Sequence, residues 1–297
     1  MSRTRRDVLL SGLALGGCAA YPPPPPAPAI PPPGHLEFSG VEDRVGGRIG
    51  VAAWNTGTGA WLTYRAHERF AMCSTFKWLL AAQMLYMDMH MPGFRDQRVR
   101  YAETDLVAHS PVTRENLSRG WMTVEELCRA TVTVSDNAAA NLLLEGAMGP
   151  EGFTRFLRQH GDSVTRLDRL EPALNENLPG DERDTTTPDA MARDLQGFLL
   201  TDHILNPAAR ERLIGWLVEA RPGLSRLRAG LPADWRAGDK TGTSDEIRNA
   251  TNDVAVAWPP GRPPIVIACY MSESAVPLPQ RNAAHAQIAR IVATEWA

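Results

Sequence analysis

Apolar residues form short runs near both ends of the chain and recur at helical spacing between those ends. Residues 48–55 and 60–67 are apolar-rich and flank a Thr-Gly-Thr-Gly turn, which predicts a β-hairpin. Residues 253–258 and 264–271 flank a Pro-Pro-Gly turn and predict a second hairpin. The two ends of the chain therefore predict a sheet.

The middle of the chain predicts helices. Residues 74–90 have helical apolar spacing, and Thr123-Val124-Glu125-Glu126 is a capping box that opens another helix. Asn206-Pro207 supplies an N-cap followed by proline at the first turn. A last helix is expected at 281–296, with an apolar stripe made of Ala284, Ile288, Ile291 and Val292.

Strands at both ends with helices between them predict an α/β (α+β) fold. We expect a discontinuous antiparallel-sheet domain flanked by helices, formed by residues 35–71 and 220–297. An all-helical domain, residues 72–219, would be inserted into it. The active site is expected in the cleft between the two domains.

The N-terminus has the pattern of an export signal, expected over residues 1–18. Thr4-Arg5-Arg6-Asp7 resembles a twin-arginine motif, and the apolar run 8–17 is too short to cross a bilayer as a helix. Leu15-Gly16-Gly17-Cys18 resembles a lipoprotein cleavage box, in which Cys18 would carry a lipid anchor. An ordinary cleaved signal with an incidental cysteine is the alternative. Either interpretation places the mature protein outside the cytoplasm, with the periplasm expected.

A proline-rich linker is expected at residues 19–34. Its prolines are too dense for helix or sheet and indicate polyproline II, which would reach about 40 Å at about 3.1 Å per residue. That length suits a spacer between a membrane anchor and an enzyme. A proline-rich ligand for a recognition module is the alternative.

Composition excludes several classes of function. The formal net charge is −3, and no basic stripe suits a nucleic acid backbone. Besides Cys18 the chain has Cys73, Cys128 and Cys269, an odd number that allows at most one internal disulfide. Since no Cys-x-x-Cys or His-x-x-x-His spacing occurs, we expect neither a metal nor a cofactor. A monomer is expected.

The chain contains only two lysines, Lys77 and Lys240, although Lys and Arg together number 31. A guanidinium stays protonated, whereas an ε-ammonium can lose its proton when burial and nearby charge lower its pKa. The positions of the two lysines are therefore candidates for proton-transfer chemistry.

Both lysines lie in short motifs that carry chemistry. Ser74-x-x-Lys77 places a hydroxyl and an amine one helical turn apart. Ser135-Asp136-Asn137 offers a hydroxyl for proton relay and an amide for a substrate carbonyl. Residues 240–243, Lys-Thr-Gly-Thr, predict an edge strand in which Gly242 lets a ligand approach the backbone. Each motif is common when it occurs alone.

Together, in this order and spacing, the three motifs resemble those of the penicilloyl-serine transferases. Residues 166–175, Arg-Leu-Asp-Arg-Leu-Glu-Pro-Ala-Leu-Asn, followed by 181–186, Asp-Glu-Arg-Asp-Thr-Thr, resemble the loop that holds the deacylating glutamate of class A serine β-lactamases. Penicillin-binding proteins lack this loop. The resemblance covers roughly residues 36–297 and implies that an ion pair between Arg169 and Asp184 closes the loop.

The resemblance implies hydrolysis of penicillins and cephalosporins, and hence antibiotic resistance, through an acyl-enzyme on Ser74. Either Lys77 or Glu171 would be the base for acylation, and Glu171 with Asn175 would activate water for deacylation. The backbone N–H groups of Ser74 and Thr243 would form the oxyanion hole. Ser135 would relay a proton, and the substrate would contact Asn137, Lys240, Thr241, Gly242, Thr243, Arg226 and His109.

Some positions depart from the family pattern. The partner of Cys128 in a frequent family disulfide is here Ala81, and the residue that carbapenem-hydrolysing relatives often link to Cys73 is here Ser244. His109 stands where relatives commonly have another aromatic ring. Residues 244–251 are about one residue longer than in close relatives, which blurs the alignment there.

Three alternatives differ in chemistry. A D,D-peptidase of cell-wall synthesis would share the three motifs but not Glu171. A β-lactam sensor would be acylated and stop. A non-catalytic surface lipoprotein would explain the N-terminus but not the two lysines.

Overall fold

The structure is a computed structural model that describes residues 36–244 and 249–296. Its strands are β1 (Arg48–Asn55), β2 (Trp61–Tyr64), β3 (Phe70–Ala71), β4 (Arg98–Arg100), β5 (Trp121–Thr123), β6 (Thr185–Thr186), β7 (Arg236–Ser244), β8 (Ala250–Trp258) and β9 (Ile265–Ser272). Its helices are α1 (Leu36–Val45), α2 (Phe76–His90), α3 (Pro111–Glu115), α4 (Val124–Thr133), α5 (Asn137–Gly146), α6 (Gly149–Gln159), α7 (Pro188–Leu199), α8 (Pro207–Glu219) and α9 (Leu278–Trp296).

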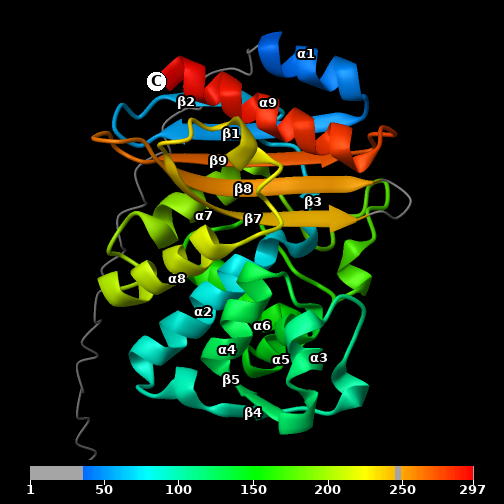
Figure 1. Cartoon of the computed structure of the whole chain (residues 1–297), viewed down its shortest axis with the longest axis vertical. Helices are drawn as coiled ribbons and strands as arrows, with labels where there is room; N and C mark the ends of the chain where they lie inside the picture. The colour runs from blue at the N-terminus through cyan, green and yellow to red at the C-terminus, as the bar shows by residue number, and fades with distance from the viewer. Residues whose placement is uncertain (1–35, 245–248, 297) are drawn as a thin grey trace, which may run out of the picture. The chain divides into compact units, whose positions relative to one another are not determined.

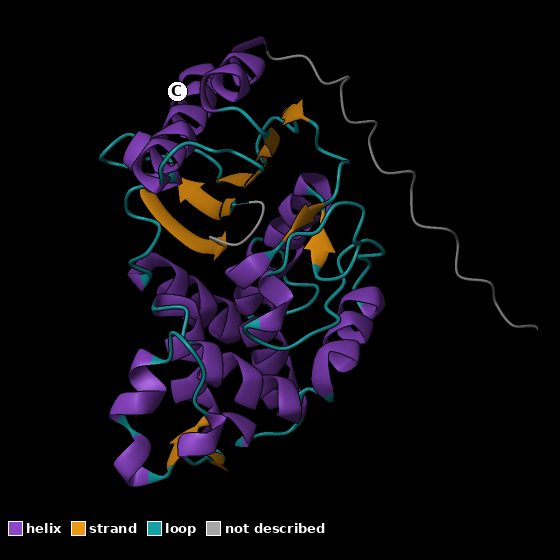
Figure 2. Ribbon diagram, turned by 90° about the vertical axis from the view of Figure 1, so that its right-hand side faces the viewer, coloured by secondary structure: helices purple, strands orange, loops and turns teal. Residues whose placement is uncertain are grey.

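A five-stranded antiparallel sheet, in the order β2-β1-β9-β8-β7, joins strands from the two ends of the chain. Helices α1 and α9 lie along one face of this sheet, and α7 and α8 lie along the other (Figure 1). Helices α2, α4, α5 and α6 gather beyond α7 and α8 (Figures 1 and 2). The expected fold class, an antiparallel sheet flanked by helices, is confirmed.

Alternation along β9 explains why the sheet is covered on both sides. Val266, Ala268 and Tyr270 pack in the core shared with the helices around α2, whereas Ile267 and Cys269 pack against α1 and α9. Successive side chains of a strand point to opposite faces, so a strand that is apolar throughout requires a cover on each face. The strand is buried along its whole length.

Several local predictions are confirmed by the capping contacts. Thr123 and Glu126 form the reciprocal capping box of α4, and the Asn206 side chain accepts from the Ala209 N–H at 2.9 Å, with Pro207 at the first turn of α8. The stripe on α9 is also confirmed, since Ala284, Ile288 and Val292 are buried against the sheet and Ile291 packs beside them.

Element boundaries differ from the prediction at several points. The strand expected at 60–67 ends at Tyr64, the strand expected to begin at 253 begins at Ala250, and the last helix begins at Leu278. Helix α1 was not predicted. Pairing along the sheet and packing against neighbours set these boundaries, and neither is encoded in local periodicity.

Candidate active site

Ser74 lies in a short 3-10 helix, Cys73–Thr75, that leads directly into α2. Cys73 has φ of 46°, a left-handed conformation uncommon for a residue with a side chain. The Thr75 hydroxyl donates to the Met72 carbonyl at 2.9 Å and lies 3.1 Å from the Tyr270 hydroxyl. The buried contacts of Thr75 therefore fix the turn, while Ser74 itself is only half-buried.

Lys77 follows one turn later and is fully buried. Its ammonium lies 2.9 Å from Glu171 Oε1, donates to the Ser135 carbonyl at 2.9 Å, and also contacts Asn137 Oδ1. Burial lowers the pKa of Lys77, and the Glu171 carboxylate opposes that shift. The amine can therefore give up a proton more readily than a lysine in water.

Glu171 connects the nucleophile to the lysine. The Ser74 hydroxyl donates to Glu171 Oε1 at 3.2 Å, the same oxygen that Lys77 contacts. Asn175 Nδ2 donates to Glu171 Oε2 at 2.6 Å, so both carboxylate oxygens have a partner. The geometry brings a hydroxyl, an amine and a carboxylate within hydrogen-bond reach of one another.

Asn141, which the sequence analysis did not identify, holds the Glu171 backbone. Its Oδ1 accepts from the Glu171 N–H, and its Nδ2 donates to the Glu171 carbonyl, each at 2.9 Å. Asn141 lies one turn after Asn137 on α5, on the same face. That i, i+4 repeat of asparagine is the signal that could have revealed it.

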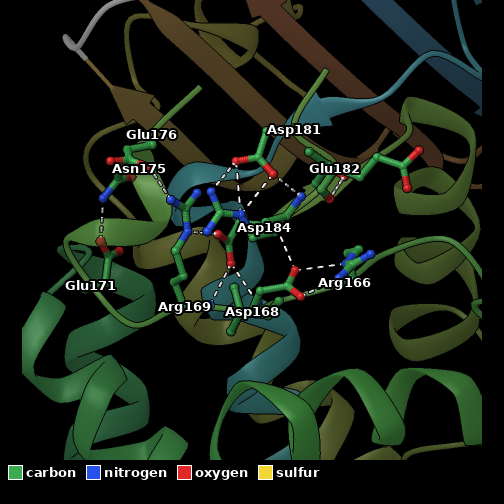
Figure 3. A network of polar contacts seen from close by, with 12 residues as sticks. Arg166, Asp168, Arg169, Glu171, Asn175, Glu176, Asp181, Glu182 and Asp184 are labelled. Carbon is green, nitrogen blue, oxygen red and sulfur yellow. Dashed lines mark hydrogen bonds and ion pairs between the residues drawn. The ribbon is translucent and has the colours of Figure 1, made fainter. Parts of the chain in front are cut away.

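The loop that carries Glu171 is closed by charge, as Figure 3 shows. Arg169 Nε lies 2.6 Å from Asp184 Oδ2, and Asp184 Oδ1 accepts from the backbone N–H groups of Asp168 and Arg169 at 2.7 and 3.0 Å. The Asp184 side chain is fully buried. The expected ion pair between Arg169 and Asp184 is confirmed.

The Ser135 hydroxyl lies between the two amines of the chain. Lys240 Nζ donates to Ser135 Oγ at 3.0 Å, and Lys77 Nζ lies 3.4 Å from the same atom. Burial, followed by the charge of Lys77, lowers the pKa of Lys240 to about 7. Ser135 therefore lies within reach of two amines of lowered pKa, of which Lys240 exchanges its proton near neutral pH.

A buried carboxylate fixes the turn that carries Ser135. Asp136 is the N-cap of α5 and accepts from the Ala139 N–H at 2.9 Å, and it also accepts from the N–H groups of Val112 and Thr113. Ser135 has φ of 61°. The structure thus assigns the capping role to Asp136 and leaves Ser135 and Asn137 facing Lys77.

Strand β7 lies at the edge of the sheet, as predicted, and approaches the Ser74 turn closely at Gly242. A Cβ at Gly242 would lie 2.5 Å from the Met72 carbonyl oxygen and 3.2 Å from Cys73 Cβ. Only glycine can occupy this position without moving the backbone. Glycine here therefore keeps Thr243, the next residue, close to the turn.

Arg226 supports the end of β7 from behind. Its guanidinium donates to Thr243 Oγ1 at 2.7 Å, to the Gly242 carbonyl at 3.0 Å and to the Asn252 carbonyl at 2.7 Å. Arg226 is 4% exposed, so it adds a buried positive charge at the end of β7, the strand that carries Lys240 and Thr241. Asn252, another residue not identified from sequence, donates to the carbonyls of Ala71 and Met72 and so ties β8 to the Ser74 turn.

His109 is the most exposed of the expected site residues. Its ring Nε2 lies 3.0 Å from the Val134 carbonyl, and its own carbonyl accepts from the Asn137 N–H at 3.0 Å. The ring therefore lies at the rim beside the turn that carries Ser135.

Cys73, Cys128 and Cys269 are buried free thiols. Within residues 36–244 and 249–296, no group of three or more His, Cys, Asp or Glu side chains could hold a metal ion. No helix in this part of the chain is long and apolar enough to span a bilayer. The expected signal, Cys18 and the proline-rich linker lie outside the described residues.

Comparison with known proteins places the whole described part of the chain in one family. Residues 37–296 match the model of the beta-lactamase enzyme family. The chain is 48% identical to beta-lactamase AST-1 of Nocardia asteroides, with 86% of this chain and 81% of that protein covered. It is 45% identical to the carbapenem-hydrolyzing beta-lactamase KPC of Klebsiella oxytoca, with coverage of 91% and 89%. Its structure matches that of the last common ancestor of Gram-negative bacteria class A beta-lactamase with a TM-score of 0.85, 52% identity and coverage of 88% and 98%.

Proposed function

Because the chain belongs to the class A family of serine β-lactamases, and is therefore a hydrolase of β-lactams, we propose that it acts through an acyl-enzyme on Ser74 that Glu171 hydrolyses. The observation that carries this mechanism is the position of Glu171 Oε1, 3.2 Å from Ser74 Oγ and 2.9 Å from Lys77 Nζ. A carboxylate in that position can serve both halves of the reaction.

In the first half, the Ser74 oxygen attacks the β-lactam carbonyl carbon while its proton passes to a base. A serine hydroxyl is weak at its free pKa and needs a base within hydrogen-bond reach. Glu171 accepts directly from Ser74, and burial lowers the pKa of Lys77, so both remain candidates for that base. The C–N bond of the ring then breaks, and Ser135 passes a proton from one of the neighbouring amines to the ring nitrogen.

The developing oxyanion would be held by the backbone N–H groups of Ser74 and Thr243. The close approach of β7 at Gly242 supports this pairing. Single donors of an oxyanion hole contribute about 10²- to 10³-fold in rate in other enzymes. Lys240, Thr241, Thr243 and Arg226 would bind the substrate carboxylate, Asn137 its side-chain amide, and His109 would stack on it at the rim.

In the second half, Glu171 takes a proton from a water molecule whose oxygen attacks the ester carbon. The ester bond to Ser74 breaks, the serine recovers its proton, and the product leaves as an open-ring acid. Asn175 holds Glu171 Oε2 at 2.6 Å and so fixes the direction of the base. Placement on a loop tied down by the Arg169–Asp184 ion pair supports this role.

The Glu171→Ala variant tests the mechanism. It should still be acylated by a penicillin but release it very slowly, so mass spectrometry should find a persistent adduct on Ser74. The matched control is Glu182→Ala, which removes an exposed carboxylate from the same loop and should turn over at about the wild-type rate. Wild-type turnover by Glu171→Ala would refute the role of Glu171. A persistent adduct on the wild-type enzyme would instead indicate a peptidase or sensor.

The division into a sheet domain, 35–71 with 220–297, and a helical domain, 72–219, fits this chemistry. Ser74 and Lys77 would come from the helical side of the cleft and Lys240 to Thr243 from the sheet side. We also propose that the enzyme acts as a monomer.

The N-terminal residues lead to a proposal about location. A twin-arginine signal, a Leu-Gly-Gly-Cys box and a proline spacer make sense together if the enzyme is exported folded and acylated at Cys18. One acyl chain anchors only marginally, whereas the multiple chains of a lipoprotein cysteine anchor stably. Cys18→Ser should therefore move activity from the membrane pellet to the soluble periplasmic fraction without changing the kinetics. Soluble wild-type enzyme whose N-terminus lies beyond Cys18 would contradict this.

A further inference from the structure

A cavity of about 360 Å³ lies away from the Ser74 site, lined by the segment that follows α6 and by one face of α7. Two acidic residues, Asp162 and Asp194, are part of this lining, although they are only 7% and 6% exposed. Carboxylates buried to this extent are normally paired with a cation or a set of donors. The partners of these two therefore decide what the cavity can hold.

The two carboxyl groups have each other as partners. Asp162 Oδ1 accepts from the N–H groups of Val164 and Thr165 at 2.7 and 3.0 Å, which fixes its orientation. The Oδ2 atoms of Asp162 and Asp194 accept from no protein donor in the described residues, and the two side chains interact with each other. Burial, followed by the charge of Asp162, raises the pKa of Asp194 well above its ordinary value.

Of the two arginines around the pair, one has another partner and the other approaches Asp162 only at long range. On α7, Arg193 lies 3.1 Å from Asp189 and stacks over the Trp61 ring. On α6, Arg158 donates to the Asp162 backbone carbonyl at 2.6 Å and stays 4.0 Å from the carboxylate.

The remaining titratable neighbours supply no counter-charge. Burial lowers the pKa of His160, which favours its neutral form, and Tyr270 on β9 faces Asp194 with a pKa that burial raises. Among the described residues, Arg158 is therefore the one cation within 4.0 Å of the pair, and it approaches Asp162 rather than Asp194.

We propose that this cavity binds a small organic cation with an apolar body, whose charged end lies against the buried carboxyl groups of Asp162 and Asp194. Because burial raises the pKa of Asp194, binding of the cation displaces the Asp194 proton to solvent. Val164, Phe198 and Ile204 line the same cavity and would contact the apolar body. The volume lies within the range of small-molecule sites, about 300–1,000 Å³.

The probe is benzamidine, a planar amidinium, with benzamide as its neutral control of the same shape. Calorimetry on the full chain should detect benzamidine binding that tightens as the pH is raised from 6 to 8, because binding releases the Asp194 proton. Titration in two buffers of different ionisation enthalpy should show release of about one proton. Benzamide should bind at least about tenfold more weakly at the higher pH. Equal binding of the two compounds, or no binding of benzamidine up to about 10 mM, would overturn the proposal.

Two variants locate the binding. Asp194→Asn keeps the shape but removes the acid, and it should abolish the pH dependence and weaken benzamidine at least about tenfold. Gly197→Leu leaves both carboxyls in place and should block the cavity, because a Cβ at Gly197 has only Ile204 Cδ1 nearby, at 3.6 Å. Turnover of a chromogenic cephalosporin should stay at the wild-type level in Gly197→Leu. Wild-type benzamidine binding by Gly197→Leu would place the site elsewhere, even if Asp194→Asn failed to fold.

Discussion

Replacement of Asp184 by asparagine tests how far charge inside one loop controls catalysis. Asp184 is fully buried, pairs with Arg169 and accepts from two backbone N–H groups (Figure 3). Asparagine has almost the same shape and tolerates the φ of 58° found here, so the backbone is not strained. The change removes the charge and turns an amide donor toward the Arg169 Nε donor.

The expected loss in the free energy of unfolding follows from the burial of this ion pair. Breaking a buried ion pair by removing one partner costs about 3–5 kcal/mol, because the other charge is left without compensation. Here Arg169 keeps an exposed partner, Glu176, and the asparagine oxygen can still accept from the two backbone N–H groups, so we expect the low end, about 3 kcal/mol. Asp184→Ala should cost roughly 1–2 kcal/mol more, because alanine has no acceptor and is strained at positive φ.

Urea unfolding and acyl-enzyme lifetime measure the two consequences. Asp184→Asn should lower the free energy of unfolding by about 3 kcal/mol with an unchanged m-value, and it should lengthen the lifetime of the penicillin adduct because Glu171 loses its position. The matched control is Asp181→Asn, which breaks a pair with the half-exposed Arg183 and should cost at most about 1 kcal/mol. If both variants lose less than about 1 kcal/mol and deacylate normally, the loop is not held by this charge.

The remaining predictions concern the lysines and the substrates. Lys77→Arg should nearly abolish turnover, because a guanidinium cannot act as a base and is too large for the buried site. Lys240→Arg should chiefly raise KM. Similar mild losses of activity in both variants would show that the lysines have no special role. Since the pKa of Lys240 is about 7, its charge is present below that pH and lost above it, so kcat/KM for substrates with a carboxylate should fall as pH rises through about 7, and Lys240→Arg should remove that fall. Penicillin and cephalosporin turnover should well exceed imipenem turnover, because Cys73 is a free thiol and Ser244 offers no sulfur for a disulfide with it. Equal catalytic efficiency on imipenem would refute this. The 45% identity to the carbapenem-hydrolyzing KPC makes the comparison a stringent one.

Local sequence signals predicted the elements whose causes are local. The capping box at Thr123 and the proline after Asn206 mark helix starts because the side chain and the orphan N–H groups lie within four residues. Helix α1 gave no such signal, since its apolar face is defined by α9 and the sheet, which come from the far end of the chain. The strand boundaries failed for the same reason, because pairing partners extend or shorten a strand.

The residues proposed to do chemistry were found by their motifs, but several of those that position them were not. Asp136 is in a motif and was noted, yet its role as the buried cap of α5 depends on N–H groups near residue 112. Asn252 is an ordinary polar residue in a strand until its contacts with the Ser74 turn are known. Tyr270 supports the same turn from β9 through Thr75. Such long-range supports leave no local pattern, so sequence alone underestimates how many residues hold the site.

The two lysines show why composition was still informative. Both are essentially fully buried, at 0% and 1% exposure, and both reach the hydroxyl of Ser135. Burial lowers the pKa of both amines, and the charge of Lys77 lowers the pKa of Lys240 further, to about 7, so Lys240 exchanges its proton near neutral pH. An arginine would keep its proton in the same buried position. Arg226 shows this, because burial lowers its pKa but a guanidinium stays charged. The site thus contains one positive charge that is always present, on Arg226, and two amines that can gain or lose a proton, on Lys77 and Lys240.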